Sequence, residues 1–308
     1  MAEAKQISPF FSIVIPVYNR AGRIGPTLKS CLEQTFQDFE IILVDDGSSD
    51  NLEEVINTYN DDRLRYIYQE NAGGGAARNT GMLAAKGQYI ALLDSDDMYF
   101  PEKLQKAYDF LTENSTFNVL YTPIQIDRGV GKYWVKPSRG IYENEHVADY
   151  LMRRRGWTPI STVVVEKNLA QKVLFNPEVV YGDDTDFAIR LYLAGGKFYM
   201  GEEALTSYTD MFSADRLSSA SGALADFDIW LDLLKPDIPR KAYYGYFGWH
   251  VAKKIVGQKP FLAFWLFFKA LFMGAYSPKM AAVVFSQVFL PRALYRQVAD
   301  YIAKMFGK

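Results

Sequence analysis

The stretch EIILVDDGSSDNLEEVINTY, residues 40–59, contains an apolar run, a polar turn and an amphipathic helix in immediate succession. The run EIILV (40–44) is apolar after its first residue, which is typical of a strand buried on both faces of a sheet. Apolar residues then recur at helical spacing, at Leu52, Val55, Ile56 and Tyr59. Asp50 precedes them as a candidate N-cap. This strand–turn–helix unit is the building block of a parallel α/β sheet.

The same unit recurs along the first third of the chain. Strands are expected at 11–17, 40–44, 65–68 and 89–93, and helices at 23–34, 51–59, 74–86 and 101–112. Two further strands are expected at 161–166 and 197–203, whereas the sequence after Leu224 reads as helices separated by prolines. The fold class is therefore predicted as α/β, a Rossmann-like, mostly parallel sheet flanked by helices and followed by an α-helical C-terminal region. The expected domains are 1–224 and 225–308.

Composition narrows the class of protein. The 308 residues are 49% hydrophobic, which is enough for a globular core. Cys31 is the single cysteine, so an intrachain disulfide and a cysteine-rich zinc site are excluded. The segment MAEAKQISPF (1–10) lacks the basic and then apolar layout of a signal peptide, which favours a cytoplasmic location.

The net charge of −2 hides a strong asymmetry. From Lys235 onward, twelve lysines and arginines face only Asp237 and Asp300, so this part carries +10 and residues 1–234 carry −12. We expect the two parts to meet different partners.

Polar residues follow each of the first four predicted strands. The candidates are Tyr18 and Asn19 after the first strand, Asp45 and Asp46 after the second, Gly74 and Arg78 in the glycine-rich loop after the third, and Asp94, Ser95, Asp96 and Asp97 after the fourth. Each motif alone is also compatible with a turn or a helix cap. Because ligands of open parallel sheets bind at the carboxyl ends of the strands, their occurrence on one edge favours a binding site.

The segment DSDD (94–97) packs three carboxylates into four residues, and these repel one another unless a cation lies among them. Carboxylates in this arrangement suit Mg²⁺ or Mn²⁺, which usually share their remaining positions with substrate phosphates. Asp45 or Asp46 is suited to accept from a base N–H, and Arg78 to meet a phosphate. A Walker A lysine is missing, and the glycines follow the third strand, not the first, which excludes a P-loop and a dinucleotide fingerprint.

These motifs, from SIVIPVYNR through VDDGSSD and GGGAARNTG to LLDSDD, closely resemble the family 2 glycosyltransferases of the GT-A fold. The resemblance extends from about residue 11 to about residue 209. It implies that Pro16, Tyr18 and Asp46 border the base of a nucleotide-diphospho sugar, that Arg78 meets the nucleotide, and that Asp94–Asp96 form the metal and ribose motif. Asp97 is a further candidate metal ligand.

A second signature, GDDTDFAIR (182–190), resembles the family's GEDxDFxxR segment. The resemblance assigns the catalytic base to Asp184, with Asp183 standing where glutamate is more usual and remaining an alternative. A helix-capping role for one of these acids is the competing interpretation.

The resemblance implies an inverting transfer of one sugar, with a UDP-sugar favoured as donor and a divalent metal as cofactor. A saccharide or lipid-linked acceptor in cell-surface polysaccharide or glycolipid synthesis is expected. The QxxRW motif of processive members is absent. A catalytically silent nucleotide-sugar-binding protein and a sugar-nucleotide nucleotidyltransferase are the alternatives.

The C-terminal region contains two strongly apolar runs, 261–275 and 280–290, each shorter than the ~20 residues that span a bilayer. They are either buried core helices or helices lying in a membrane interface. The surrounding basic and aromatic residues favour contact of residues 240–308 with an anionic membrane surface, on the inner face of the plasma membrane. Runs this apolar argue against a nucleic-acid partner.

Overall fold

The computed structural model describes residues 8–127, 133–179, 182–209, 229–291 and 294. The chain divides into two compact units, one of residues 1–142 and 157–221 and the other of residues 143–156 and 222–308. Residues 143–156 lie inside the first expected domain, but they pack in the second unit.

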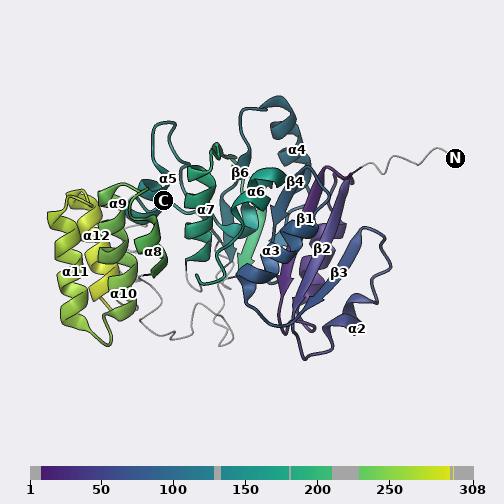
Figure 1. Ribbon diagram of the computed structural model, residues 1–308, viewed down its shortest axis with the longest axis horizontal. Helices are drawn as coiled ribbons and strands as arrows, with labels where there is room; N and C mark the ends of the chain where they lie inside the picture. Colours follow the sequence, from purple (N-terminus) through teal and green to yellow (C-terminus); the bar gives the residue numbers. More distant parts are fainter. Residues whose placement is uncertain (1–7, 128–132, 180–181, 210–228, 292–293, 295–308) are drawn as a thin grey trace. The chain divides into compact units, whose positions relative to one another are not determined.

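The first unit is built on a seven-stranded sheet (Figure 1). Its strands, in the order β10-β6-β9-β4-β1-β2-β3, are β10 Phe198–Met200, β6 Val119–Tyr121, β9 Val164–Glu166, β4 Tyr89–Leu92, β1 Phe11–Val17, β2 Phe39–Asp46 and β3 Leu64–Gln69. β9 runs antiparallel to β4 and β6, and the other neighbouring pairs are parallel. The predicted mostly parallel sheet is confirmed.

Helices cover both faces of this sheet. They are α1 Ile24–Leu32, α2 Leu52–Ile56, α3 Gly74–Ala84, α4 Lys103–Glu113, α6 Lys167–Val173 and α7 Asp183–Leu193. Successive strand residues face opposite sides. Accordingly, Ile13 packs in one core cluster with Leu28 of α1 and Leu104 of α4, whereas Val14 packs in the other with residues of α3, α6 and α7.

Near the N-terminus of α2, the cap prediction is wrong. Asn51 is the N-cap residue, in the left-handed region at φ 57°, and its side chain makes no capping hydrogen bond. The Asp50 carboxylate instead accepts from the Ala21 N–H at 2.8 Å, so it ties the segment after β1 to the turn after β2.

A second, four-stranded sheet was not predicted. It has the order β5-β11-β7-β8, with β5 Met98–Tyr99, β11 Thr206–Thr209, β7 Ile124–Asp127 and β8 Tyr133–Lys136. These strands have two to four residues each.

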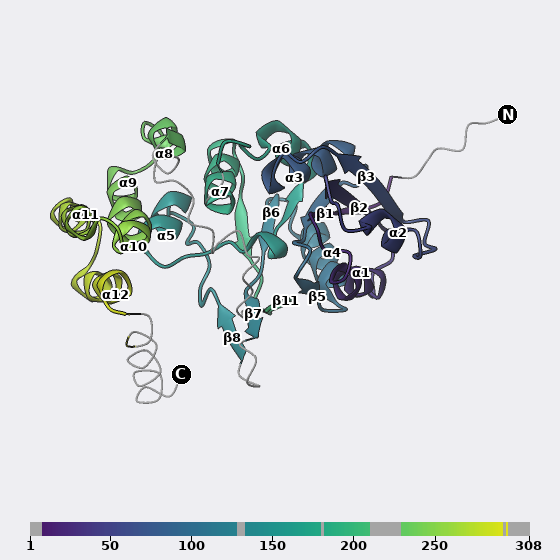
Figure 2. The ribbon, with the colours of Figure 1, turned by 90° about the horizontal axis from the view of Figure 1, so that it is seen from below.

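The second unit is helical (Figures 1 and 2). It contains α5 Val147–Arg153, α8 Ile229–Leu234, α9 Arg240–Tyr246, a π-helical turn Phe247–Val251, α10 Ala252–Ile255, α11 Pro260–Phe272 and α12 Pro278–Phe289. Pro260 and Pro278 open their helices, where the missing N–H costs no hydrogen bond. None of the helices in the described part of the chain is long and apolar enough to cross a bilayer.

Candidate functional site

The predicted site residues after β1 lie at the carboxyl end of that strand. Pro16 is half-buried opposite Val44 of β2, and Tyr18 is 50% exposed. Asn19 adopts a left-handed φ of 50°. Its N–H donates to Ser48 Oγ at 2.9 Å, and its side-chain oxygen accepts from the Ser49 N–H at 2.8 Å. Asn19 thereby joins the end of β1 to the turn after β2.

Asp45 is buried at the end of β2, where its carboxylate accepts from the Ser48 N–H at 2.8 Å and from the Tyr66 hydroxyl at 2.5 Å. Burial and the hydrogen bond to Asp45 raise the pKa of Tyr66, which keeps the phenol protonated as a donor. Asp45, Tyr66 and Tyr68 line a hollow of about 270 Å³. An aromatic ring and a carboxylate there are suited to a planar, hydrogen-bonding group.

Asp46, also buried, shapes the glycine-rich loop from within the protein. Its carboxylate accepts from Gln69 Nε2 at 2.7 Å, from the Ala72 N–H at 2.9 Å and from the Gly73 N–H at 2.8 Å. Gly73 has φ +90°, a conformation that favours glycine. These bonds fix the chain just before α3 begins at Gly74.

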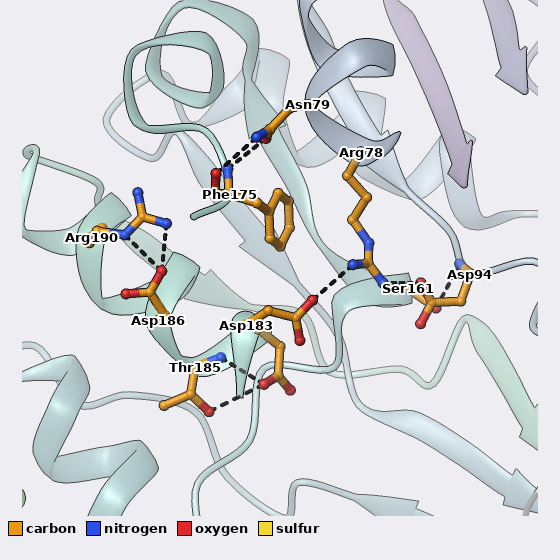
Figure 3. A network of polar contacts seen from close by, with 10 residues as sticks. Arg78, Asn79, Asp94, Ser161, Phe175, Asp183, Thr185, Asp186 and Arg190 are labelled. Atoms are coloured by element: carbon orange, nitrogen blue, oxygen red, sulfur yellow. Dashed lines mark hydrogen bonds and ion pairs between the residues drawn. The ribbon is translucent and has the colours of Figure 1, made fainter. Parts of the chain in front are cut away.

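Arg78 joins the two acidic motifs (Figure 3). Its guanidinium contacts Asp94 Oδ1 at 2.7 Å and Asp183 Oδ2 at 2.9 Å. It also lies 5.2 Å above the ring of Phe175, and Gly74 lies beside it because a Cβ there would be 3.5 Å from Nη1. Burial disfavours the charged guanidinium, but Asp94 and Asp183 raise the pKa of Arg78 above its ordinary value. Arg78 therefore supplies positive charge to Asp94, one of the three carboxylates of DSDD, and to Asp183.

Asp183 and Asp184 are the first two residues of α7, which follows Gly182 at φ +79°. Burial and the neighbouring Asp183 raise the pKa of Asp184 to about 6, against the opposing hydrogen bonds from Thr185 and Trp157. The Thr185 N–H donates to Asp184 Oδ1 at 2.7 Å. Burial also raises the pKa of Asp183, although Arg78 opposes this shift. A carboxyl group that titrates near neutrality is suited to proton transfer.

Hydrogen bonds and a stacked pair of rings hold Arg78 and the start of α7 in place. Asn79 exchanges two hydrogen bonds with the backbone of Phe175, at 2.8 and 2.6 Å, and the Phe175 ring stacks on Phe187 of α7 at 4.0 Å. Asp186 is buried and accepts two bonds from Arg190, at 2.8 and 2.6 Å. Arg190 in turn donates to the Val173 carbonyl at 2.8 Å, which anchors α7 to the end of α6.

The four residues of DSDD diverge. Asp94 turns towards Arg78, while its N–H donates to Ser161 Oγ at 3.1 Å. The Ser95 carbonyl accepts from Thr27 Oγ1 at 3.0 Å, Asp96 is exposed, and Asp97 is 4% exposed. Within the described ranges, no three His, Cys, Asp or Glu side chains are grouped to hold a metal ion. Asp94 and Asp96 would offer Mg²⁺ or Mn²⁺ the hard oxygen ligands that these ions prefer.

Several neighbours of these residues were not identified from the sequence. They are Tyr66 beside Asp45, Ser161 beside Asp94, Phe175 below Arg78, and Trp157 and Thr185 beside Asp184. Thr185 lies within the GDDTDF signature, so its position was visible. The other four come from segments without a recognisable motif, and only the fold brings them to the site.

Comparisons with known proteins identify the family of this chain. The profile described as "Glycosyl transferase family 2" matches residues 12–172. The amylovoran biosynthesis glycosyltransferase AmsB of Erwinia amylovora is 31% identical over 77% of this chain and 81% of its own length. The glycosyltransferase GlyG of Streptococcus pneumoniae is 31% identical over 72% of this chain and 76% of its own length.

Two solved structures share the fold. S. aureus TarS 1–349, in complex with UDP-GlcNAc, superposes with a TM-score of 0.65 at 22% identity and covers 90% of this chain and 84% of its own. The mannosyltransferase PcManGT of Pyrobaculum calidifontis, in complex with GDP-Man and Mn²⁺, superposes with a TM-score of 0.58 at 17% identity. The match covers 98% of this chain and 89% of PcManGT. The fold is of the GT-A type, and the chain belongs to glycosyl transferase family 2.

Proposed function

We propose that this chain transfers a single sugar from a nucleotide-diphospho sugar to an acceptor hydroxyl, with inversion at the anomeric carbon. The observation that carries the proposal is the bridge formed by Arg78 between Asp94 and Asp183. A donor-binding motif and a candidate base motif thus share one guanidinium, although 105 residues separate Arg78 from Asp183. An elongated donor lying along this edge has its diphosphate next to Arg78 and its sugar next to α7.

In the proposed reaction, Asp184 accepts the proton of the acceptor hydroxyl as that oxygen forms a bond to the anomeric carbon. The bond between this carbon and the diphosphate oxygen breaks on the opposite face, and its electron pair leaves with the nucleoside diphosphate. Arg78 compensates the negative charge that grows on the leaving group. Because there is a single displacement, an α-linked donor gives a β-linked product.

A divalent ion, when bound, supplies further positive charge to the leaving diphosphate. Asp96 and Asp94 are the residues that would hold it, and Asp97 is a third candidate with less access. Mn²⁺ in the PcManGT complex supports a divalent ion as cofactor, and UDP-GlcNAc in the TarS complex supports UDP as the nucleotide. We propose that the nucleobase of the donor binds beside Tyr18, in the hollow next to Asp45 and Tyr66.

For the acceptor, we propose a lipid-linked saccharide in cell-surface polysaccharide synthesis at the inner face of the plasma membrane. The name of the relative AmsB, an amylovoran biosynthesis enzyme, supports the polysaccharide. The basic C-terminal region supports a lipid-linked acceptor, because a basic, acid-poor and aromatic-rich segment is typical of contact with anionic membranes.

Ligand-induced stabilisation of the full chain tests the donor. UDP, GDP, CDP and dTDP are each added with and without Mn²⁺, and the melting temperature is recorded for the wild type, Asp96→Asn and the control Asp62→Asn. Asp62 is an exposed acid of the same unit, so its variant matches the charge change. We expect UDP with Mn²⁺ to stabilise the wild type and the control by about 2.7 kcal/mol at a hundred times the dissociation constant, and Asp96→Asn to lose most of this gain.

Product analysis separates the proposed reaction from its alternatives. Incubation with the UDP-sugar and an acceptor, followed by NMR of the anomeric proton, should reveal a β-linked product from an α-linked donor. An α-linked product would exclude inversion. Formation of UTP from the UDP-sugar and pyrophosphate would indicate a nucleotidyltransferase, and tight donor binding without turnover on any acceptor would indicate a silent binding protein.

A further inference from the structure

Helix α11 has two apolar faces. Ala263, Phe267 and Ala270 are buried within the second unit. On the opposite side, aromatic side chains remain exposed, namely Phe261 at 91%, Phe264 at 49%, Trp265 at 54%, Phe268 at 43% and Phe272 at 87%. At 3.6 residues per turn these five residues fall on one face, which we name the α11 aromatic face. Helix α11 is therefore apolar on two opposite sides.

The α11 aromatic face continues onto α12, which lies next to α11 in Figure 2. The Phe264 ring lies 5.8 Å from the Phe289 ring, and Phe285, which is 40% exposed, lies 4.9 Å from Phe289. A continuous exposed aromatic surface of this kind marks an interaction site.

Positive charge borders this surface. The sequence from residue 238 to residue 299 contains no aspartate or glutamate. Lys259 and Lys279 are exposed at the starts of α11 and α12. Lys269 lies on α11 itself, with its Nζ 4.4 Å above the Trp265 ring and 5.3 Å above the Tyr244 ring. Aromatic side chains in an acid-free, lysine-bearing surface match the headgroup region of an anionic bilayer.

We propose that the α11 aromatic face inserts into the headgroup region of an anionic bilayer, with α11 lying parallel to the membrane plane. This inference deepens the membrane-side location proposed above and rests on it. Phe261 and Phe272, the two most exposed rings, are eleven residues apart, or about 16 Å along the helix. Anchors at both ends hold the helix flat. A second copy of the chain is a poorer occupant, because two acid-free, basic surfaces would repel one another.

Vesicle co-sedimentation of the full chain tests this surface. The vesicles contain phosphatidylcholine alone or with 30% phosphatidylglycerol, and the binding constant is measured for four proteins. These are the wild type, Phe261→Ser/Phe272→Ser, the charge variant Lys259→Glu/Lys279→Glu, and the control Leu83→Ser/Leu193→Ser, which removes two exposed apolar residues of the first unit. The response of each protein to UDP and Mn²⁺ is measured in parallel.

We expect the wild type and the control to bind anionic vesicles equally. The aromatic variant and the charge variant should both bind at least tenfold more weakly, with an unchanged UDP response. Equal vesicle binding by Phe261→Ser/Phe272→Ser, or equal binding of the wild type to neutral and anionic vesicles, would overturn the inference. So would a wild-type dimer in light scattering that Phe261→Ser/Phe272→Ser converts to a monomer. If the wild type responds to UDP but binds no vesicles, the membrane face is refuted while donor binding stands.

Discussion

At Asp184 the protein holds a carboxyl group in surroundings that oppose its ionisation. Burial and the adjacent Asp183 act in the same direction, and the hydrogen bonds from Thr185 and Trp157 only partly compensate them. The same arrangement that brings the pKa to about 6 also means that the ionised form costs stability. The proposed base must be ionised to accept a proton, but the ionised form lowers the stability of the fold.

The Asp184→Asn variant is expected to change activity and stability in opposite directions. Asparagine keeps the size of the side chain but cannot accept the proton, so we expect sugar transfer to fall by about 10²–10⁴-fold. Because the ionised carboxylate is removed, the folded state should gain on the order of 1–3 kcal/mol at pH 8. Transfer rates and denaturant unfolding of Asp184→Asn, with Asp62→Asn as the control, measure both effects.

The stability gain of Asp184→Asn should depend on pH. The pKa of Asp184 is raised in the folded state, so its contribution to stability is complete below the ordinary value of 3.8 and is lost as the pH rises through about 6. The stability gain of Asp184→Asn should therefore be largest at pH 8 and shrink towards pH 4, while wild-type transfer rises through pH 6. A gain that does not change with pH would show that Asp184 is not the titrating group.

At the scale of elements, helix α3 positions the site because it lies unusually close to the sheet. A Cβ at Gly81 would lie 2.4 Å from Val14 Cγ1 and 3.2 Å from Val44 Cγ2. Arg78 and Asn79 are on the same helix, one turn earlier. A shift of α3 away from β1 and β2 would therefore also move the guanidinium that joins the two acidic motifs.

We predict that Gly81→Ala destabilises the fold by about 1–3 kcal/mol, because the added methyl group overpacks a buried contact. The donor response should weaken as well, since Arg78 moves with the helix. Gly22→Ala is the matched control, because a Cβ at Gly22 meets nothing within 4 Å. Denaturant unfolding and the UDP-dependent melting shift of both variants measure the effects, and equal stability of the two would refute the close packing of α3.

Most strands and helices of the first unit were predictable because continuous apolar runs or helical spacing of apolar residues mark them in the sequence. Strand β1 was predicted at its exact bounds, and the starts of α3 and β4 were also correct. Strands β5 and β11 were not predicted, because the segments MY and TSYT contain no continuous apolar run that would mark them as strands. The acidic motifs were visible in the sequence, but the link between Asp94 and Asp183 through Arg78 was not, because it depends on tertiary packing.

At the scale of the whole molecule, the second unit is discontinuous in sequence. Its helix α5 comes from the middle of the chain and packs on α9. Val147, Ala148, Tyr150 and Met152 of α5 are completely buried, and Arg153 Nε donates to the Ala275 carbonyl at 2.7 Å. A cut near Leu224, the boundary suggested by the sequence, leaves α5 behind without these partners.

We predict that a chain ending at Leu224 aggregates, because the apolar face of α5 becomes exposed to solvent. Replacing Tyr150 by serine and Leu151 and Met152 by glutamine in the shortened chain should restore a monomer, since α5 then presents a polar face. Size-exclusion chromatography with light scattering distinguishes the two shortened proteins. A monomeric, unsubstituted chain 1–224 would show that α5 does not depend on α9. If the prediction holds, a truncated chain loses activity because exposed α5 makes it aggregate, whether or not it has lost contact with a membrane. The role of the α11 aromatic face therefore has to be tested by point variants in the full chain.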